Sequence, residues 1–287
     1  MPYARPEALV GTAWLALHMS DPHIRILDAS FKQPGVAPTA RQDYERGHIP
    51  GAAFFDIDDV ATPDTELPHM VPTPELFAQK MTERGIGDDD RVIVYDSVGL
   101  SSAGRAWWML RLFGHDNVAL LDGGLPKWKA EGRPLENAVP AIPHRRFTPV
   151  FRPELQRDKE AIRANIDRRA EQVVDARSAG RFEGTAEETW PGRRRGHIPG
   201  SRNLPFDRVT DPRTRQLRSP EELRRLFDEA GVSLDRPVAT SCGSGVTACA
   251  VAFALHLIGG PEAAVYDGSW AEWGLPGDTP IETGSAR

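Results

Sequence analysis

The chain is poor in cysteine and has no long apolar run. Cys242 and Cys249 are the only two cysteines in 287 residues, which is too few for a disulfide framework, so we expect both thiols to be reduced. A membrane-spanning helix needs about 20 apolar residues in succession, and no segment approaches that length. The first residues also lack the apolar core of a secretory signal. These absences predict a cytoplasmic protein without a membrane partner.

An excess of charge of one sign is also missing. The 35 Lys and Arg residues are offset by 41 Asp and Glu residues, for a formal net charge of -6. Phosphate backbones are bound by clustered basic side chains, and the densest basic run is only Arg193-Arg194-Arg195. Nucleic acid is therefore not an expected partner. No His and Cys cluster has metal-ligand spacing and no glycine-rich segment has a nucleotide fingerprint, so we expect no metal and no cofactor.

What the sequence does contain is an internal repeat. Four motifs of the first half recur in the same order in the second half, displaced by 145 to 149 residues. A displacement of this size indicates a duplicated domain rather than a solenoid. The paired positions are Asp28 with Asp175, His48 with His197 (each within Gly-His-Ile-Pro-Gly), Asp96 with Cys242, and Asp122 with Asp267.

Short β-branched runs alternate with helical patterns in each copy. Strands are predicted at residues 24–28, 92–95 and 118–122, and at 172–175, 237–241 and 264–267. Helices are predicted at residues 74–84 and 105–113, and at 220–230 and 246–258. This alternation predicts an α/β fold in which each domain is a parallel sheet flanked by helices. We expect the domains at residues 1–136 and 154–287, joined by a proline-rich linker at residues 137–153.

The segment that carries chemistry follows the strand predicted at residues 237–241. It reads Cys242-Gly243-Ser244-Gly245-Val246-Thr247, and a helical pattern comes directly after it. Its two glycines permit a tight loop whose backbone N–H groups converge on one point, and the positive end of the next helix faces the same point. Such a cradle stabilises a thiolate. Because the first copy has Asp96 here, we expect only the second copy to be catalytic. Cys249 lies within an apolar helical pattern and is expected to pack in the core.

This loop resembles the active-site signature of the 3-mercaptopyruvate sulfurtransferases of the rhodanese superfamily. The repeated Gly-His-Ile-Pro-Gly motif, the Trp107-Trp108 pair and Asp267-Gly268-Ser269-Trp270 are also similar to that family. The similarity extends from about residue 9 to residue 273. It implies two tandem rhodanese-like domains, the first non-catalytic and the second catalytic.

The resemblance also implies a reaction. Sulfur would pass from 3-mercaptopyruvate to Cys242 as a persulfide, and pyruvate would leave. An acceptor thiol, such as a thioredoxin-like protein or a small thiol, or cyanide would then collect the sulfur. Asp58, His69 and Ser244 would form a proton relay. Without the resemblance, Asp58 reads as a loop carboxylate and His69 as an exposed histidine.

By the same resemblance, Arg181 would bind the carboxylate of the donor, next to the loop residues Gly243, Gly245, Val246 and Thr247. The family has a second carboxylate-binding arginine nine residues after the first, where this chain has Trp190. Either Arg193, Arg194 or Arg195 takes that place, or Arg181 holds the carboxylate as the one arginine.

Three alternatives are left open. The first is a thiosulfate sulfurtransferase. Related enzymes that prefer thiosulfate have a loop that resembles Cys-Arg-Lys-Gly, with two cations beside the sulfur, whereas this loop has Gly243 and Ser244 at those positions. A phosphatase with a similar cradle needs an arginine six residues after the cysteine, where this chain has Ala248. A non-catalytic persulfide carrier or binding module would not turn over with excess donor.

Overall fold

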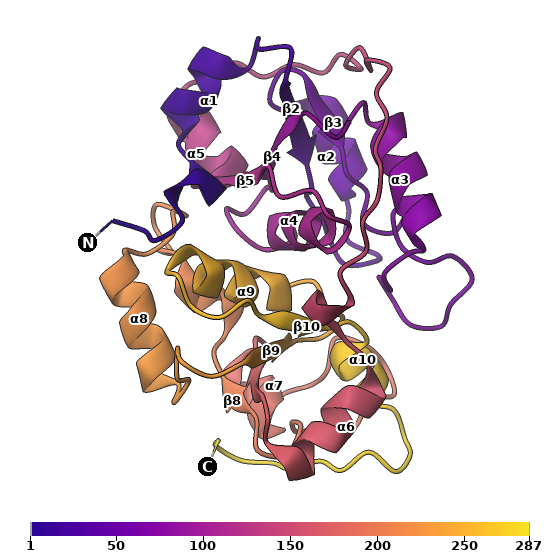
Figure 1. The fold of residues 1–287 in the computed structure, drawn as a ribbon, viewed down its shortest axis with the longest axis vertical. Helices are drawn as coiled ribbons and strands as arrows, with labels where there is room; N and C mark the ends of the chain where they lie inside the picture. The colour runs from indigo at the N-terminus through magenta and orange to yellow at the C-terminus, as the bar shows by residue number, and fades with distance from the viewer. Residues whose placement is uncertain (1, 287) are drawn as a thin grey trace.

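The computed structural model describes residues 2–286, which form two α/β domains stacked on each other (Figure 1). The strands of the first domain are β1 (Leu9–Val10), β2 (Ile24–Asp28), β3 (Ala52–Phe54), β4 (Arg91–Tyr95) and β5 (Val118–Leu121). Its helices are α1 (Thr12–His18), α2 (Ala40–Arg46), α3 (Pro74–Glu83), α4 (Ala103–Leu112) and α5 (Gly124–Ala130).

The second domain repeats this order of elements. Its strands are β6 (Gln156–Arg157), β7 (Gln172–Asp175), β8 (Arg202–Asn203), β9 (Val238–Ser241) and β10 (Ala264–Tyr266). Its helices are α6 (Lys159–Arg168), α7 (Ala179–Glu183), α8 (Pro220–Glu229), α9 (Ala248–Leu257) and α10 (Ser269–Trp273).

Both sheets have the same topology. The strand orders are β1-β5-β4-β2-β3 and β6-β10-β9-β7-β8, and neighbouring strands pair in parallel. The second order is the first with every number raised by five, as a duplication requires. The predicted fold class, two parallel sheets flanked by helices, is confirmed.

The local signals placed the central elements within two residues of their observed bounds. Ser219 and Glu222 form the capping box that begins α8, and Gly259, with φ of 75°, follows the end of α9. The helix predicted from residue 246 begins at Ala248 instead, because Val246 and Thr247 belong to the loop after β9. The edge strands β1, β3, β6 and β8 were not predicted, since runs of two or three residues carry no periodic signal.

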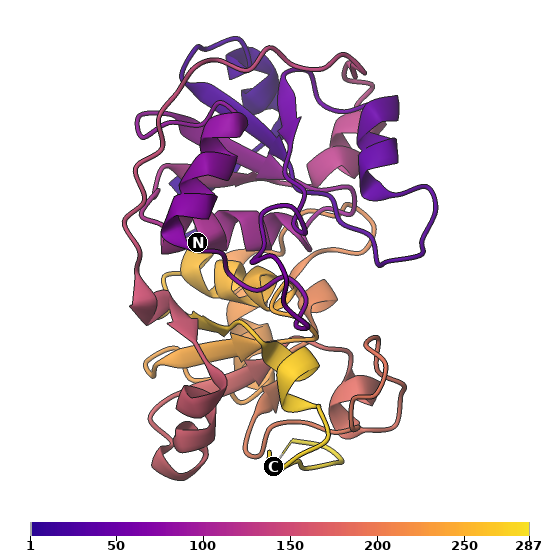
Figure 2. The same ribbon diagram turned by 90° about the vertical axis from the view of Figure 1, so that its right-hand side faces the viewer.

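Helices α4 and α9 face each other across the domain interface (Figures 1 and 2). They share one apolar cluster, in which the rings of Trp107 and Phe253 meet edge to face with centroids 5.0 Å apart. The two helices come close together at Gly104, where an added Cβ atom would lie 2.9 Å from the backbone nitrogen of Ala250. Apolar side chains of the two domains thus belong to one cluster at the interface.

Each domain also sends one loop to the other in a pseudo-twofold exchange. After β3, the first domain's loop places the backbone N–H of Val71 2.8 Å from the carboxylate of Asp267. After β8, the second domain's loop places the N–H of Leu217 2.8 Å from the carboxylate of Asp122. Both loops contain a non-glycine residue of positive φ, His69 at 61° and Arg215 at 62°. The exchange brings His69 into the second domain.

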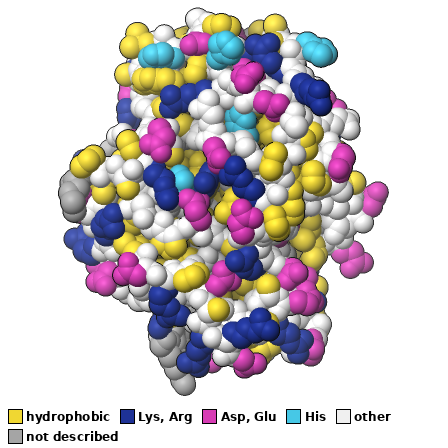
Figure 3. Space-filling view, viewed as in Figure 1, with side chains coloured by type: hydrophobic (Ala, Val, Ile, Leu, Met, Phe, Trp, Pro, Cys, Tyr) yellow, Lys and Arg dark blue, Asp and Glu magenta, His cyan; other side chains and the backbone are white. Residues whose placement is uncertain are grey.

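The remaining connections lie on the surface. Residues 137–152 contain no helix or strand and run along the side of the molecule from the first domain to the second (Figure 1). Basic and acidic side chains are interspersed on the face in Figure 3. Within residues 2–286, no helix has the length and apolar character needed to cross a membrane.

Gly104→Ala tests the close contact between α4 and α9. Since the backbone of α9 must move to admit the methyl group, we expect a loss of about 1–3 kcal/mol in the free energy of unfolding. Urea unfolding followed by circular dichroism measures this loss. The control is Gly11→Ala, because a Cβ atom at Gly11 would have no neighbour within 4 Å. Equal losses in the two variants would contradict the proposed tight contact.

His115 predicts a pH dependence of stability. Burial lowers the pKa of the His115 imidazole, and also the pKa of the His256 imidazole, below the ordinary 6.5. The unfolded chain therefore binds more protons at these positions, and stability decreases as the pH falls from about 6.5 towards the lowered pKa values. Melting temperatures measured at about pH 7.5 and at about pH 5.5 check this loss of stability. His115→Gln is expected to show part of the wild-type decrease, and an undiminished decrease would rule His115 out.

Candidate active site between the two domains

Cys242 lies in the loop between β9 and α9, and its residue surface is 1% exposed. Helix α10 fixes this loop from behind. The backbone N–H groups of Trp270 and Ala271 donate to the carbonyls of Cys242 and Gly243 at 3.0 and 2.7 Å. The N–H of Cys242 donates to Ser269 Oγ at 3.1 Å. With its carbonyls held by α10, the loop can present its remaining N–H groups to the nucleophile.

The first domain shows what such a loop binds. The carboxylate of Asp96, the counterpart of Cys242, accepts four backbone N–H groups at 2.7–3.0 Å, from Val98, Gly99, Ser101 and Ala103. The first domain therefore fills its own anion cradle.

In the second domain the cradle is not filled by a carboxylate. Within the described chain, the N–H groups of Ser244, Gly245, Val246 and Thr247 have no protein acceptor. Gly245 has φ of 72°, and a Cβ atom there would lie 2.6 Å from the carbonyl oxygen of Asp267, so this position requires glycine. These donors suit a negatively charged sulfur at Cys242.

The loop after β3 adds a chain of polar groups. Ser244 Oγ lies 3.0 Å from His69 Nδ1, and His69 Nε2 lies 3.2 Å from Asp58 Oδ1. The histidine side chain is 1% exposed and the aspartate side chain 65% exposed. The three groups thus connect solvent with the buried loop. Reading His69 alone as an exposed residue was wrong, because the exchange of loops buries it against the other domain.

A buried ion pair that the sequence analysis missed holds this arrangement. Arg105 in α4 donates to Asp267 Oδ1 at 2.7 Å, to the carbonyl of His69 at 2.6 Å and to the carbonyl of Gly245 at 3.2 Å. Arg105 is 0% exposed and Asp267 2%. Burial lowers the pKa of Arg105, but the carboxylate of Asp267 and the nearby Cys249 together raise that pKa above its ordinary value. One guanidinium therefore joins the loop after β3, which carries His69, to the loop after β9, which carries Cys242. A helical arginine gave no signal of this in the sequence.

Arg181 lies on the other side of the loop, in a network of alternating charge. Glu188, whose side chain is 3% exposed, accepts from Arg181 Nη2 and from Arg177 Nη1, each at 2.7 Å. Arg177 is also paired with Asp175 at 2.6 Å and lies over the ring of Trp270. Arg181 is thus held in place by a carboxylate that the sequence analysis did not single out.

The three consecutive arginines are engaged elsewhere. Arg193 donates to the carbonyl of Ala271 at 2.9 Å, Arg194 donates to the carbonyl of Thr279 at 3.1 Å, and Arg195 pairs with Glu187. All three are thus bonded to other groups, and the role of Arg181 as the one carboxylate-binding arginine stays a prediction.

These groups surround a cavity of about 310 Å³ beyond the carboxyl end of β9, where ligands of parallel α/β sheets bind. The cavity is lined by residues of both domains. Those of the second domain include Cys242, Gly243, Ser244, Val246, Thr247, Arg177, Arg181 and Trp190, and those of the first include Phe31 and Ser101. Asp58, His69 and Gly245 are not part of this lining.

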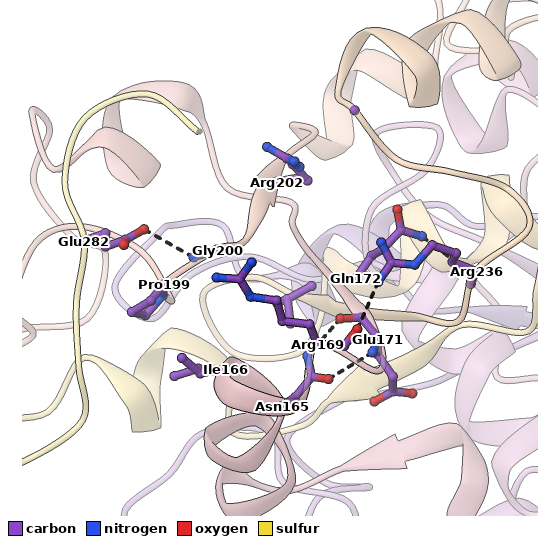
Figure 4. A pocket seen from close by; sticks show the side chains of 12 residues that line it. Asn165, Ile166, Arg169, Glu171, Gln172, Pro199, Gly200, Arg202, Arg236 and Glu282 are labelled. Carbon is purple, nitrogen blue, oxygen red and sulfur yellow. Dashed lines mark hydrogen bonds between the residues drawn. The ribbon is translucent and has the colours of Figure 1, made fainter.

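A larger cavity, of about 560 Å³, lies at the opposite end of the same sheet (Figure 4). It adjoins Gln172, the first residue of β7, and is lined by Arg169, Arg202 and Arg236. Its acidic residues are engaged, Glu171 with Arg157 and Glu282 with the N–H of Gly200. It contains no nucleophilic cysteine, so size alone does not identify the reactive site.

Cys249 has a structural environment. Its Sγ donates to the carbonyl of Gly245 at 3.2 Å, and burial raises the pKa of its thiol well above the ordinary value. It is therefore a neutral core residue, as expected. Within residues 2–286 no group of three or more His, Cys, Asp or Glu side chains is placed to hold a metal ion.

Comparison with known proteins agrees with this architecture. The rhodanese-like domain family matches residues 11–131 and 158–275. The chain is 44% identical to a 3-mercaptopyruvate sulfurtransferase of Escherichia coli, over 95% of this chain and 97% of that protein. It is 40% identical to the mitochondrial thiosulfate/3-mercaptopyruvate sulfurtransferase 1 of Arabidopsis thaliana, over 96% of this chain and 78% of that protein.

The structural comparison gives the same result. The crystal structure of SseA from Escherichia coli, described as a 3-mercaptopyruvate sulfotransferase, matches with a TM-score of 0.83 and 42% identity. The match covers 92% of this chain and 99% of that one. The chain is a two-domain rhodanese-like protein and belongs to the rhodanese family.

Asp267→Asn tests the buried ion pair. Since it leaves the guanidinium of Arg105 buried without a counter-charge, we expect a loss of about 3–5 kcal/mol in the free energy of unfolding. The matched control is Asp122→Asn, because Asp122 accepts from the neutral groups of Leu217 and Gln216. Chemical denaturation of both variants measures the difference. A loss at Asp267 no greater than that at Asp122 would contradict a structural role for the charge pair.

Proposed function

We propose that this protein is a 3-mercaptopyruvate sulfurtransferase whose nucleophile is Cys242. The observation that carries the proposal is the cradle of backbone N–H groups at residues 244–247. It lacks a carboxylate acceptor, whereas Asp96 fills the equivalent cradle of the first domain. The N–H groups of the cradle can donate hydrogen bonds to the sulfur of Cys242 and to the persulfide that forms on it. A binding module has no need of both this cradle and the polar chain that ends at Ser244.

The first half-reaction is a transfer of sulfur. The thiolate of Cys242 attacks the sulfur atom of 3-mercaptopyruvate, a sulfur–sulfur bond forms, and the carbon–sulfur bond of the donor breaks. The electron pair of the broken bond passes to carbon as the enolate of pyruvate, whose charge is shared with the ketone oxygen. A proton on that carbon completes pyruvate, and the proton lost by the donor thiol balances it.

Ser244, His69 and Asp58 are the groups that we propose to move this proton. Ser244 Oγ is the member that lines the cavity, and its hydrogen-bond partner His69 can supply a proton from the side of Asp58. Proton transfer by positioned groups accelerates such reactions by about 10²–10⁴-fold. Arg181 binds the donor carboxylate, for which a guanidinium is a suitable partner.

The second half-reaction needs an acceptor. A thiolate attacks the outer sulfur of the Cys242 persulfide, takes it as a new persulfide and releases the thiolate of Cys242. A thioredoxin-like protein or a small thiol in the cytoplasm fits this chemistry, and cyanide would leave as thiocyanate. The relative from Arabidopsis thaliana is named for both thiosulfate and 3-mercaptopyruvate, which makes thiosulfate the donor to compare.

Turnover with the two donors, with one acceptor thiol, tests the proposal. We expect 3-mercaptopyruvate to exceed thiosulfate in kcat/KM by about tenfold or more, since the loop has no cation beside Cys242. Cys242→Ser should be inactive, Cys249→Ala active, and Ser244→Ala reduced mainly in kcat. Intact-protein mass spectrometry after donor alone should show one added sulfur that requires Cys242. Preference for thiosulfate would overturn the donor, and a single loading without turnover would indicate a carrier.

A further inference from the structure

The indole of Trp190 lies beside Arg181 above the nucleophile loop. A Cβ atom on Gly243, the residue after Cys242, would lie 3.1 Å from Arg181 Nη2 and 3.7 Å from Trp190 Nε1. Both side chains line the cavity that contains Cys242. The ring of Trp190 also meets the ring of His69 at 68°, with centroids 5.8 Å apart. One N–H donor from each of two side chains therefore lies beside Gly243, in the cavity that Cys242 also lines.

The N–H of Trp190 is available to a ligand. Four other tryptophans, Trp108, Trp128, Trp270 and Trp273, donate their indole N–H to a backbone carbonyl at 2.8–3.1 Å. In the described part of the chain, Nε1 of Trp190 has no such acceptor, which is also true of Trp14 and Trp107. Trp190 is only partly buried and lines the cavity that contains Cys242, so its N–H can donate to an acceptor brought by the donor molecule.

The charges around Trp190 determine what kind of anion fits. Arg181 and Arg177 are matched by Glu188 and Asp175, so these four side chains sum to zero. Glu188 accepts hydrogen bonds from Nε and Nη2 of Arg181, so Nη1 can donate to a ligand. A carboxylate can accept from Nη1 and from the uncharged indole N–H. Because no cation among these side chains is left unmatched, the first negative charge of a ligand is held by hydrogen bonds alone. A second negative charge would add a desolvation cost that nothing here compensates.

We propose that Trp190 is a donor-specificity residue: its N–H shares the carboxylate of a monoanionic 2-oxo acid with Arg181, and its lack of charge disfavours dianionic donors such as thiosulfate. The identity of the favoured donor rests on the function proposed above. An arginine at this position would offer the same carboxylate a second cation and would offer thiosulfate the counter-charge that it lacks here.

Steady-state kinetics of Trp190→Phe and Trp190→Arg with both donors test the proposal. The phenylalanine keeps an aromatic wall and removes the N–H, so KM for 3-mercaptopyruvate should rise on the order of tenfold while kcat changes little. KM for thiosulfate should not change. Trp190→Arg should lower KM for thiosulfate severalfold. Trp14→Phe, which alters a tryptophan stacked on His18 in the first domain, serves as the control and should leave both KM values unchanged.

A binding measurement separates this inference from the proposed function. Calorimetric titration of pyruvate into Cys242→Ser, with and without Trp190→Phe, reports carboxylate binding without turnover. Weaker pyruvate binding in the double variant, on the order of tenfold, supports the role of the N–H. Equal pyruvate affinity, or KM values that rise equally for both donors, would overturn it. Failure of the wild-type enzyme to use 3-mercaptopyruvate would overturn the proposed donor, while the pyruvate titration would still decide whether Trp190 binds a carboxylate.

Discussion

The buried ion pair between Arg105 and Asp267 is the interaction on which the candidate site depends. It joins α4 of one domain to the end of β10 of the other, and its guanidinium also holds the carbonyls of His69 and Gly245. Two charges removed from water need hydrogen-bond partners beyond each other. Here the two loops supply partners for Nη1 and Nη2 of Arg105, whereas its buried Nε has no partner among the described residues. The contacts that stabilise the buried pair therefore also hold His69 against the loop of Cys242.

The duplication gave two similar loops with different anions. In the first domain the carboxylate of Asp96 occupies the cradle permanently, which stabilises the loop and leaves no room for reaction. In the second domain Cys242 brings a side chain whose charge and bonding can change. The exchanged loops differ in the same way, because His69 faces the reactive cradle whereas Arg215 lies over Gly99 in the unreactive one. One domain thereby became a support that contributes polar groups to its partner.

The donor side of the cavity is governed by charge balance rather than by an excess of cations. Glu188 orients Arg181 and at the same time cancels its charge, so binding there relies on hydrogen-bond geometry. This arrangement is consistent with relatives that are named for one or for both sulfur donors, since small changes around one guanidinium can alter the preference between a carboxylate and a dianion. The position of Trp190 is where this chain differs from the pattern that its loop resembles.

The sequence by itself determined the duplication, the central strands, the capping box of α8 and the loop that begins at Cys242. All of these are encoded by residues near one another in the chain, where periodicity, glycine conformation and capping act. It also suggested Asp58, His69 and Ser244, through resemblance rather than through local physics. Only the tertiary structure decided that His69 is buried, that Glu188 bridges two arginines and that Arg105 meets Asp267. Arg105 and Asp267 are 162 residues apart, and a contact between such distant residues exists only because α4 packs on α9 and each domain lends the other a loop.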